Sequence, residues 1–305
     1  MANLKDIKSR INSVENTKKI TRAMKMVAAA KVKKAETSVK ASRPFSQELL
    51  SLFRKMLSTV GELSQSGEKI ENSLNNYYGL LTNREIKTVG LVLISSNKGL
   101  AGAYNANVVR AILKKIKAYK EDEKKVVLYL VGQKGIAAFK HKNDEYEIAN
   151  TYLAVANDPT PSGAQLIAED LANDYINQKI DKIEIITTRF NNMMSYSVQD
   201  WTVLPAKLDY DSEDKTGEPD ALMEFIPSTD SILKKIVPMY ITNTIFQALL
   251  EANASELASR MTAMSAASNN AEEMIDTLTV NYNKARQGAI TQELIEIVSG
   301  AEAQG

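Results

Sequence analysis

The amino-acid sequence predicts an α/β protein in which the two ends of the chain form a long antiparallel coiled coil and the middle forms a small globular domain. Three observations support this fold class: a heptad pattern near the C-terminus, an apolar stripe near the N-terminus, and alternating strand and helix patterns between them. We expect four segments: an N-terminal helix over residues 1–60, an α/β domain over 85–208, an acidic loop over 209–232 and a C-terminal helix over 233–305.

The N-terminal helix is indicated by apolar or small residues at helical spacing. The stripe comprises Leu4, Ile7, Ile11 and Val14 and continues through Thr17, Thr21, Met24, Ala28 and Ala35. Steps of three and four residues place these side chains on one face of a helix, as in a coiled-coil seam. We expect Pro44 to kink this helix, because proline removes a backbone donor, and we expect the helix to end before the polar stretch 63–78.

The same segment is strongly basic. Up to Arg43 it contains twelve Lys or Arg residues against three acids, a net charge of +9, whereas the whole chain carries only +1. Such a surface suits the phosphates of a nucleic acid, an anionic membrane or an acidic protein, and it is also compatible with a simple solvated face. Lysines on several faces and few aromatic residues disfavour the membrane. From the residues alone, the nucleic-acid and protein alternatives both stay open.

The middle of the chain alternates short apolar runs with helical patterns, which is typical of a Rossmann-like α/β layer. Strands are expected at residues 88–94, 126–131 and 183–187, with a further edge strand at 195–204. Helices are expected at residues 106–117 and 161–176, the second capped by Ser162. Between residues 209 and 230, eight acids face one lysine in a segment that also contains Gly and Pro, so we expect a loop or hinge there.

The C-terminal helix is indicated by a heptad pattern in a proline-free segment, residues 255–303. One column comprises Leu250, Leu257, Met264, Ala271, Leu278 and Ala285, and a second column adds Ala267 and Met274. Alanine and methionine in such a seam allow a partner helix to approach closely but bury little area per residue, so this helix needs a partner. We expect the helix to begin near Pro238.

The sequence argues against chemistry by this chain alone. It has no cysteine and a single histidine, His141, in a lysine-rich run. The stretch around Lys98, SSNKGLAG, follows a predicted strand but lacks the spacing and the terminal Gly-Lys-Ser/Thr of a phosphate-binding loop, so we expect an ordinary strand-to-helix turn. No apolar run approaches the ~20 residues of a membrane span, and the amphipathic start does not read as a signal peptide. We expect no catalytic residue, no metal ligand and no cofactor.

Three segments resemble the gamma subunit of F-type ATP synthase, the central rotor shaft. They are LKDIKSRINSVENTKKITRAMKMVAAAKVKKA, SSNKGLAGAYNANV, and the C-terminal block SELASRMTAMSAASNNAEEMIDTLTVNYNKARQGAITQELIEIVSGAEA. The resemblance implies a non-catalytic subunit of a proton-transporting ATP synthase, present as a single copy. The implied partners are three alpha and three beta subunits, the epsilon subunit and the membrane c-ring, with no nucleic acid. It also implies a peripheral location on the cytoplasmic face of a bacterial cell membrane.

The resemblance further implies which residues meet the ring of alpha and beta subunits. On the N-terminal helix the matching positions are Arg22, Met24, Lys25, Lys31, Lys33 and Lys34, where basic side chains pass an acidic loop of the beta subunits. On the C-terminal helix they are Arg260, Arg286, Gln287 and Thr291. Two other readings are a nucleic-acid-binding coiled coil, which predicts steeply salt-dependent DNA binding, and a small nucleotide enzyme, which the incomplete phosphate loop disfavours.

Overall fold

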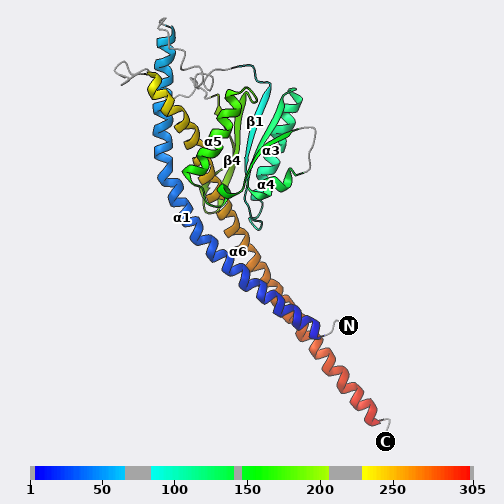
Figure 1. Ribbon diagram of the computed structural model, residues 1–305. Helices are drawn as coiled ribbons and strands as arrows, with labels where there is room; N and C mark the ends of the chain where they lie inside the picture. Colours follow the sequence, from blue (N-terminus) through cyan, green and yellow to red (C-terminus); the bar gives the residue numbers. More distant parts are fainter. Residues whose placement is uncertain (1–3, 66–83, 141–145, 206–228, 303–305) are drawn as a thin grey trace. The chain divides into compact units, whose positions relative to one another are not determined.

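The computed structural model describes residues 4–65, 84–140, 146–205 and 229–302 (Figure 1). The chain divides into two compact units: Met1–Ala30 with Arg260–Gly305, and Lys31–Ser259. The elements run in the order α1 (Leu4–Gln65), β1 (Thr88–Ile94), α3 (Tyr104–Glu121), β2 (Lys125–Val131), α4 (Gln133–Ala138), β3 (Glu147–Tyr152), α5 (Pro161–Ile176), β4 (Lys182–Asn192), β5 (Ser195–Leu204) and α6 (Thr229–Glu302). Long terminal helices and an α/β sheet domain confirm the predicted fold class.

The sheet of the larger unit has the strand order β3-β2-β1-β4-β5. β3, β2, β1 and β4 are parallel, and β5 pairs antiparallel with β4 at the edge. The predicted strands at 88–94, 126–131 and 195–204 are confirmed, and β4 continues to Asn192 because its polar second half pairs with β5. β3 was not predicted, because its exposed and half-buried residues alternate without an apolar run.

Each face of the sheet is covered by helices (Figure 1). α3 and α4 pack on one face through a cluster that includes Val108 and Ile112 of α3 and Phe139, which directly follows α4. α5 and α6 pack on the opposite face, where Leu171 and Leu249 are fully buried. The buried sides of α3 and α5 repeat every three to four residues, so the helical period of their apolar residues determines which side faces the sheet.

Two predicted helix starts are corrected. The cap of α5 is Thr160, not Ser162: the Thr160 hydroxyl accepts a hydrogen bond from the Gly163 amide at 3.1 Å, and Pro161 fits the first helical position. α6 begins at Thr229 rather than near Pro238. It continues through the proline because buried residues on both sides, Val237 and Ile241, pack into the core, and this packing outweighs the lost hydrogen bond.

Other expectations fall partly or wholly beyond the described residues. Residues 209–228 of the predicted acidic loop, and His141, lie outside them. Residues 229–232, also predicted as loop, are instead the start of α6. The expected end of the first helix before residue 63 is wrong, because α1 continues through Pro44 and extends to Gln65.

In the smaller unit, one stripe on each helix is shielded from solvent. Thr21 and Ala28 are buried on α1, and Met264 and Ala271 are buried on α6. The first predicted column of α6 is therefore shielded, but the second is wrong at Met274, which is half exposed, because the stripe steps by four residues to Ile275. On α1, Thr17 is exposed and the half-buried Lys18 takes its place for the same reason. A step of three residues and a step of four residues both keep a side chain on the same face of a helix. Only the packing of the two helices decides which step the shielded stripe takes.

Candidate functional site

The predicted contact residues are distributed over both units. In the smaller unit Arg22 and Lys25 are exposed one turn apart on α1, and Met24 between them is half-buried. Lys31, Lys33 and Lys34 are exposed at the α1 end of the larger unit. On α6, Arg260 is half-buried, whereas Arg286, Gln287 and Thr291 are exposed. The Thr291 hydroxyl donates to the Gln287 carbonyl at 2.9 Å, so these two residues are one turn apart and share a helix face.

Large apolar side chains are also exposed beyond the seam of α6, and the sequence analysis missed them. They are Ile290, Leu294, Ile295, Ile297 and Val298, with Ile297 67% exposed. Within the described part of the chain, every residue from Thr291 to Ala301 is exposed. Contiguous exposed apolar side chains of this kind mark protein interaction surfaces. The sequence could have indicated these residues, because they are apolar and follow Ala285, the last member of the heptad column.

One ion pair joins the two helices within the smaller unit. Lys18 Nζ lies 2.8 Å from Glu272 Oε1, with 60% of the glutamate side chain exposed. The hydrogen bond and the charge of Lys18 lower the pKa of Glu272. Because the pair is solvent-exposed, it contributes to the pairing of the helices without dominating it.

A buried carboxylate organises the larger unit, and the sequence did not reveal it. Glu251 of α6 has a side chain with 0% exposure. Arg43 of α1 donates to both carboxylate oxygens, from Nε at 2.8 Å and from Nη2 at 2.9 Å. The Phe190 amide of β4 donates at 2.8 Å and Gln247 Nε2 at 3.0 Å, while Arg189 Nε lies 3.7 Å away. Hydrogen bonding to Glu251 raises the pKa of Arg43 despite the opposing effect of burial, so the guanidinium stays charged.

Further contacts connect the same three elements. Arg43 Nη2 also donates to the Phe190 carbonyl at 2.7 Å, and the Thr187 hydroxyl of β4 donates to the Ala248 carbonyl of α6 at 3.1 Å. Between the helices, Asn243 Nδ2 donates to Ser46 Oγ at 3.0 Å. Residue numbers rise along α1 while those of their partners fall along α6, so the two helices are antiparallel here. We call Arg43, Gln247, Glu251 and the Phe190 backbone the Glu251 cluster.

The loop after β1 leads into α3, as expected for a strand-to-helix turn. The Ser95 amide donates to the Val131 carbonyl and the Ser96 amide to Asn105 Oδ1, so these donors are occupied. Gly132 has φ +92°, and a Cβ there would lie 2.2 Å from the Ser95 carbonyl oxygen. The loops after β1 and β2 therefore pack directly on each other instead of surrounding a ligand.

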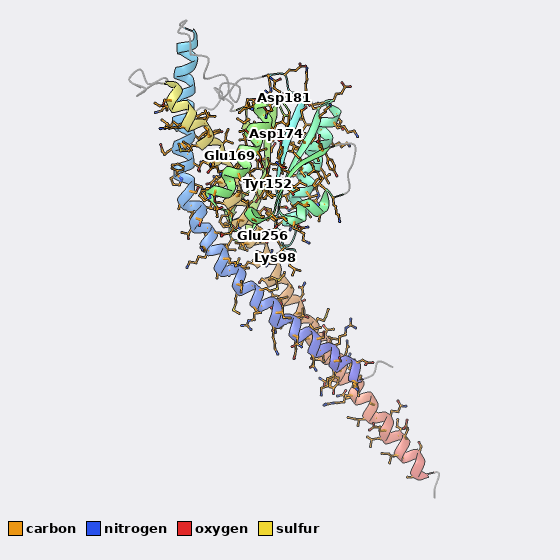
Figure 2. The ribbon with its side chains drawn as sticks, viewed as in Figure 1. Lys98, Tyr152, Glu169, Asp174, Asp181 and Glu256 are labelled. Atoms are coloured by element: carbon orange, nitrogen blue, oxygen red, sulfur yellow. The ribbon has the colours of Figure 1, made fainter. Side chains whose placement is uncertain are left out.

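Helix α6 fills the place where doubly wound α/β domains usually bind ligands. That crevice lies at the carboxyl ends of the strands where the chain changes sides, here between β1 and β4. Among the described residues, a cavity of about 10 Å³ lies there, between Ser95, Ser96 and the α6 residues Asn253 and Glu256. Figure 2 shows Glu256 and Lys98 at this end of the sheet. Ser259 Oγ of α6 donates to the Ala101 carbonyl at 2.7 Å, which fixes the loop against the helix.

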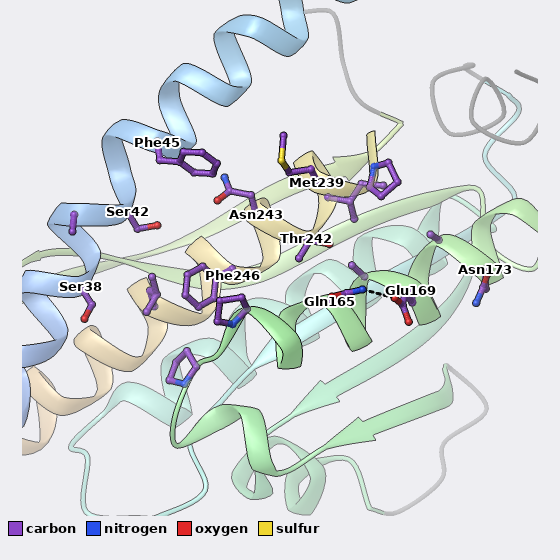
Figure 3. A pocket seen from close by; sticks show the side chains of 18 of the residues that line it. Ser38, Ser42, Phe45, Gln165, Glu169, Asn173, Met239, Thr242, Asn243 and Phe246 are labelled. Atoms are coloured by element: carbon purple, nitrogen blue, oxygen red, sulfur yellow. Dashed lines mark hydrogen bonds between the residues drawn. The ribbon is translucent and has the colours of Figure 1, made fainter. Parts of the chain in front are cut away.

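A larger open groove lies between α1, α5 and α6 (Figure 3). Its volume is about 1060 Å³, and its walls include Phe45, Ala168, Met239 and Phe246. Gln165 and Glu169 of α5, which are hydrogen-bonded to each other at 2.8 Å, lie along its rim. No Lys or Arg is among the described residues that line it, so the groove lacks the cations that bind phosphate.

A second buried carboxylate, Glu184 of β4, is paired with Lys182 and Lys115. Burial alone would raise its pKa, but the hydrogen bond and charge of Lys182, assisted by Tyr119 and Lys115, lower the pKa overall. The side chain therefore stays ionised between the sheet and α3.

Within the described ranges, no group of three or more His, Cys, Asp or Glu side chains is arranged to hold a metal ion. None of the helices in that part of the chain combines the length and hydropathy needed to cross a membrane. Long terminal helices and a five-stranded, Rossmann-like sheet define an α/β protein with paired terminal helices.

Comparison with known proteins agrees with this architecture. A family model described as ATP synthase matches residues 3–304. The chain is 40% identical to the ATP synthase gamma chain of Synechococcus sp. (strain JA-3-3Ab), covering 99% of this chain and 100% of the relative. It is 38% identical to the ATP synthase gamma chain of Halothermothrix orenii, with 99% of each chain covered.

Solved structures show the same fold. A chain from the central stalk and c-ring of the Tetrahymena thermophila mitochondrial ATP synthase matches with TM-score 0.59 and 25% identity, covering 82% of this chain and 99% of that one. A chain from the Euglena gracilis mitochondrial ATP synthase matches with TM-score 0.65 and 19% identity, covering 99% and 94%. The chain belongs to the ATP synthase gamma chain family.

Proposed function

We propose that this chain is the central rotor subunit of the F1 part of a proton-transporting ATP synthase and that it carries no catalytic group of its own. The observation that supports this most strongly is the match to ATP synthase gamma chains over nearly the whole sequence. The filled crevice at the sheet supports a structural rather than an enzymatic role, since α6 occupies the position of a ligand.

In the proposed mechanism, the helix pair makes different contacts with each of the equivalent subunits that surround it. A helix pair with basic residues on one stretch and exposed apolar residues on another cannot meet three equivalent subunits in the same way. Each orientation of the pair therefore favours a different conformation, and hence a different nucleotide affinity, at each site of the ring. Rotation driven by proton flow would take each site of the ring through these conformations in turn.

The proposed contacts with the ring use the exposed residues described above. Arg22, Lys25, Lys31, Lys33 and Lys34 would face acidic segments of the beta subunits, with Met24 beside them. Arg260, Arg286, Gln287 and Thr291 would contact ring loops from α6. The exposed apolar residues beyond Ala285 would occupy an apolar sleeve.

The remaining partners follow from the family. The sheet domain would bind the epsilon subunit and the membrane c-ring, with one copy of this chain per complex and a peripheral location on the cytoplasmic face of the membrane. The similar Tetrahymena thermophila chain belongs to a central stalk and c-ring, which supports this assembly.

Co-expression with alpha and beta subunits tests the proposal. We expect a stable complex on gel filtration and steady ATP hydrolysis that requires this chain. A chain that elutes alone and binds DNA with a steep salt dependence would instead support a nucleic-acid-binding coiled coil.

A further inference from the structure

We propose that Glu251 is a positioning residue for rotation: the Glu251 cluster fixes α1, α6 and β4 in one register and transmits torque between the helix pair and the sheet domain. This inference rests on the proposed rotor function. It concerns residues of the larger unit only, all of which lie between Lys31 and Ser259.

The cluster joins three elements at one point. Glu251 belongs to α6, Arg43 to α1 and Phe190 to β4. The arginine contacts both other elements, through the Glu251 carboxylate and the Phe190 carbonyl. The carboxylate likewise contacts both, through Arg43 and the Phe190 amide. Displacement of any one element therefore breaks hydrogen bonds to both of the others.

The apolar contacts around the Glu251 cluster cannot by themselves fix the register of α1, α6 and β4. Around the cluster, α6 meets the sheet and α5 through apolar residues such as Ile245, Ala248 and Leu249. Apolar burial is non-directional, so a small rotation or slide of α6 exchanges one apolar contact for another at modest cost. A bidentate charge pair is directional, and a slip would leave a fully buried carboxylate without its partner.

Fixing register is the best-attested role of buried polar groups in helix pairs. A rotor requires such a device more than a static protein does, because the helix pair turns against a resisting load. Two neighbouring hydrogen bonds, Thr187 with Ala248 and Asn243 with Ser46, also hold α6 in register. On α6 they lie about one turn and about two turns from Glu251.

The experiment uses the complete ATP synthase in inverted membrane vesicles. For each variant of this chain, we measure ATP hydrolysis, ATP-driven proton uptake by dye quenching, and the amount of assembled complex. The decisive quantity is proton uptake per ATP hydrolysed. Glu251→Gln removes the charge with little change of shape. Arg43→Met combined with Glu251→Leu removes both charges of this pair if the single variant fails to assemble. Arg189, whose side chain is 35% exposed, keeps its charge in contact with solvent.

We expect proton uptake per ATP to fall at least about fivefold in both assembled variants, the lower end of typical coupling effects, while hydrolysis continues. The control is Glu36→Gln, which removes a carboxylate from a local pair with Lys40 on α1, and its ratio stays at the wild-type value. A wild-type ratio in assembled Glu251→Gln, or in the double variant if only that one assembles, overturns the proposal. If the unmodified chain neither assembles nor supports proton uptake, the rotor function itself fails, which is a different result.

Discussion

Phe53 of α1 stacks on Tyr240 of α6, with ring centroids 4.4 Å apart and planes inclined by 14°. Phe53 is 1% exposed and belongs to the same apolar cluster as α5 and the sheet, so this ring contact connects the helix pair to the core of the sheet domain. Stacking of aromatic rings adds to the stabilisation from the buried area.

Replacing Phe53 by alanine removes both the buried area and the stack. We expect Phe53→Ala to lower the free energy of unfolding by about 3–5 kcal/mol, as for other buried aromatic residues. Urea unfolding followed by circular dichroism measures this. Phe45→Ala is the matched control on the same helix, since Phe45 is 55% exposed. Equal losses for the two variants would contradict the assigned packing.

Glycine is required at position 132 and not at position 288. Gly132→Ala places a methyl group against the Ser95 carbonyl in a left-handed backbone, and we expect a loss of stability of at least about 1–3 kcal/mol. Gly288 lies in α6 with nothing within 4 Å of an added Cβ, so Gly288→Ala should stabilise the helix by about 1 kcal/mol. Thermal unfolding should show a lower melting temperature for Gly132→Ala and a higher one for Gly288→Ala. A shift in the same direction for both variants would refute the prediction.

Because Glu184 is buried and ionised, we expect the stability of the protein to fall at low pH. Its pKa is lowered in the folded protein, so the stabilisation is present above its ordinary pKa of 4.5 and is lost as the pH falls below that value. We expect Glu184→Gln to flatten the acid side of a plot of melting temperature against pH, recorded between about pH 3 and pH 7. Glu147→Gln, at an exposed position of β3, should leave the plot unchanged. An acid limb that is equally steep in the Glu184 variant and the wild type would disprove this role.

The exposed apolar end of α6 should determine affinity for the ring. Ile297→Asp introduces a charge where we propose an apolar sleeve, and we expect association with the alpha and beta subunits to weaken about tenfold or more. Glu293→Gln, on the same exposed segment, is the control and should change affinity little. The dissociation constant measured by fluorescence titration distinguishes them. Unchanged binding by Ile297→Asp would show that this end lies outside the interface.

The parts of the fold that repeat in sequence were predictable. Apolar runs predicted β1 and β2, and the heptad column predicted the buried Met264 and Ala271. β3 was missed because it contains no apolar run of the kind that predicted β1 and β2. The start of α6 was misplaced because a local rule for proline was overridden by tertiary packing around Val237.

The candidate sites were less predictable, for a different reason. Glu251 reads as an ordinary helical glutamate in the sequence, and its partner Arg43 is 208 residues away. Only the fold brings the two together, and burial then gives the pair its importance. The basic positions of α1 were identified through the resemblance, since charge alone did not distinguish an acidic protein from a nucleic acid as the partner.

The most direct test of the central claim is single-molecule rotation. The complex of this chain with alpha and beta subunits is fixed to a surface through the ring, and a bead is attached to an exposed position of the sheet domain, for example an introduced cysteine at Asn177. If this chain is the rotor, ATP drives unidirectional rotation of the bead. A stable, ATP-hydrolysing complex in which the bead does not rotate would contradict the proposed rotor function.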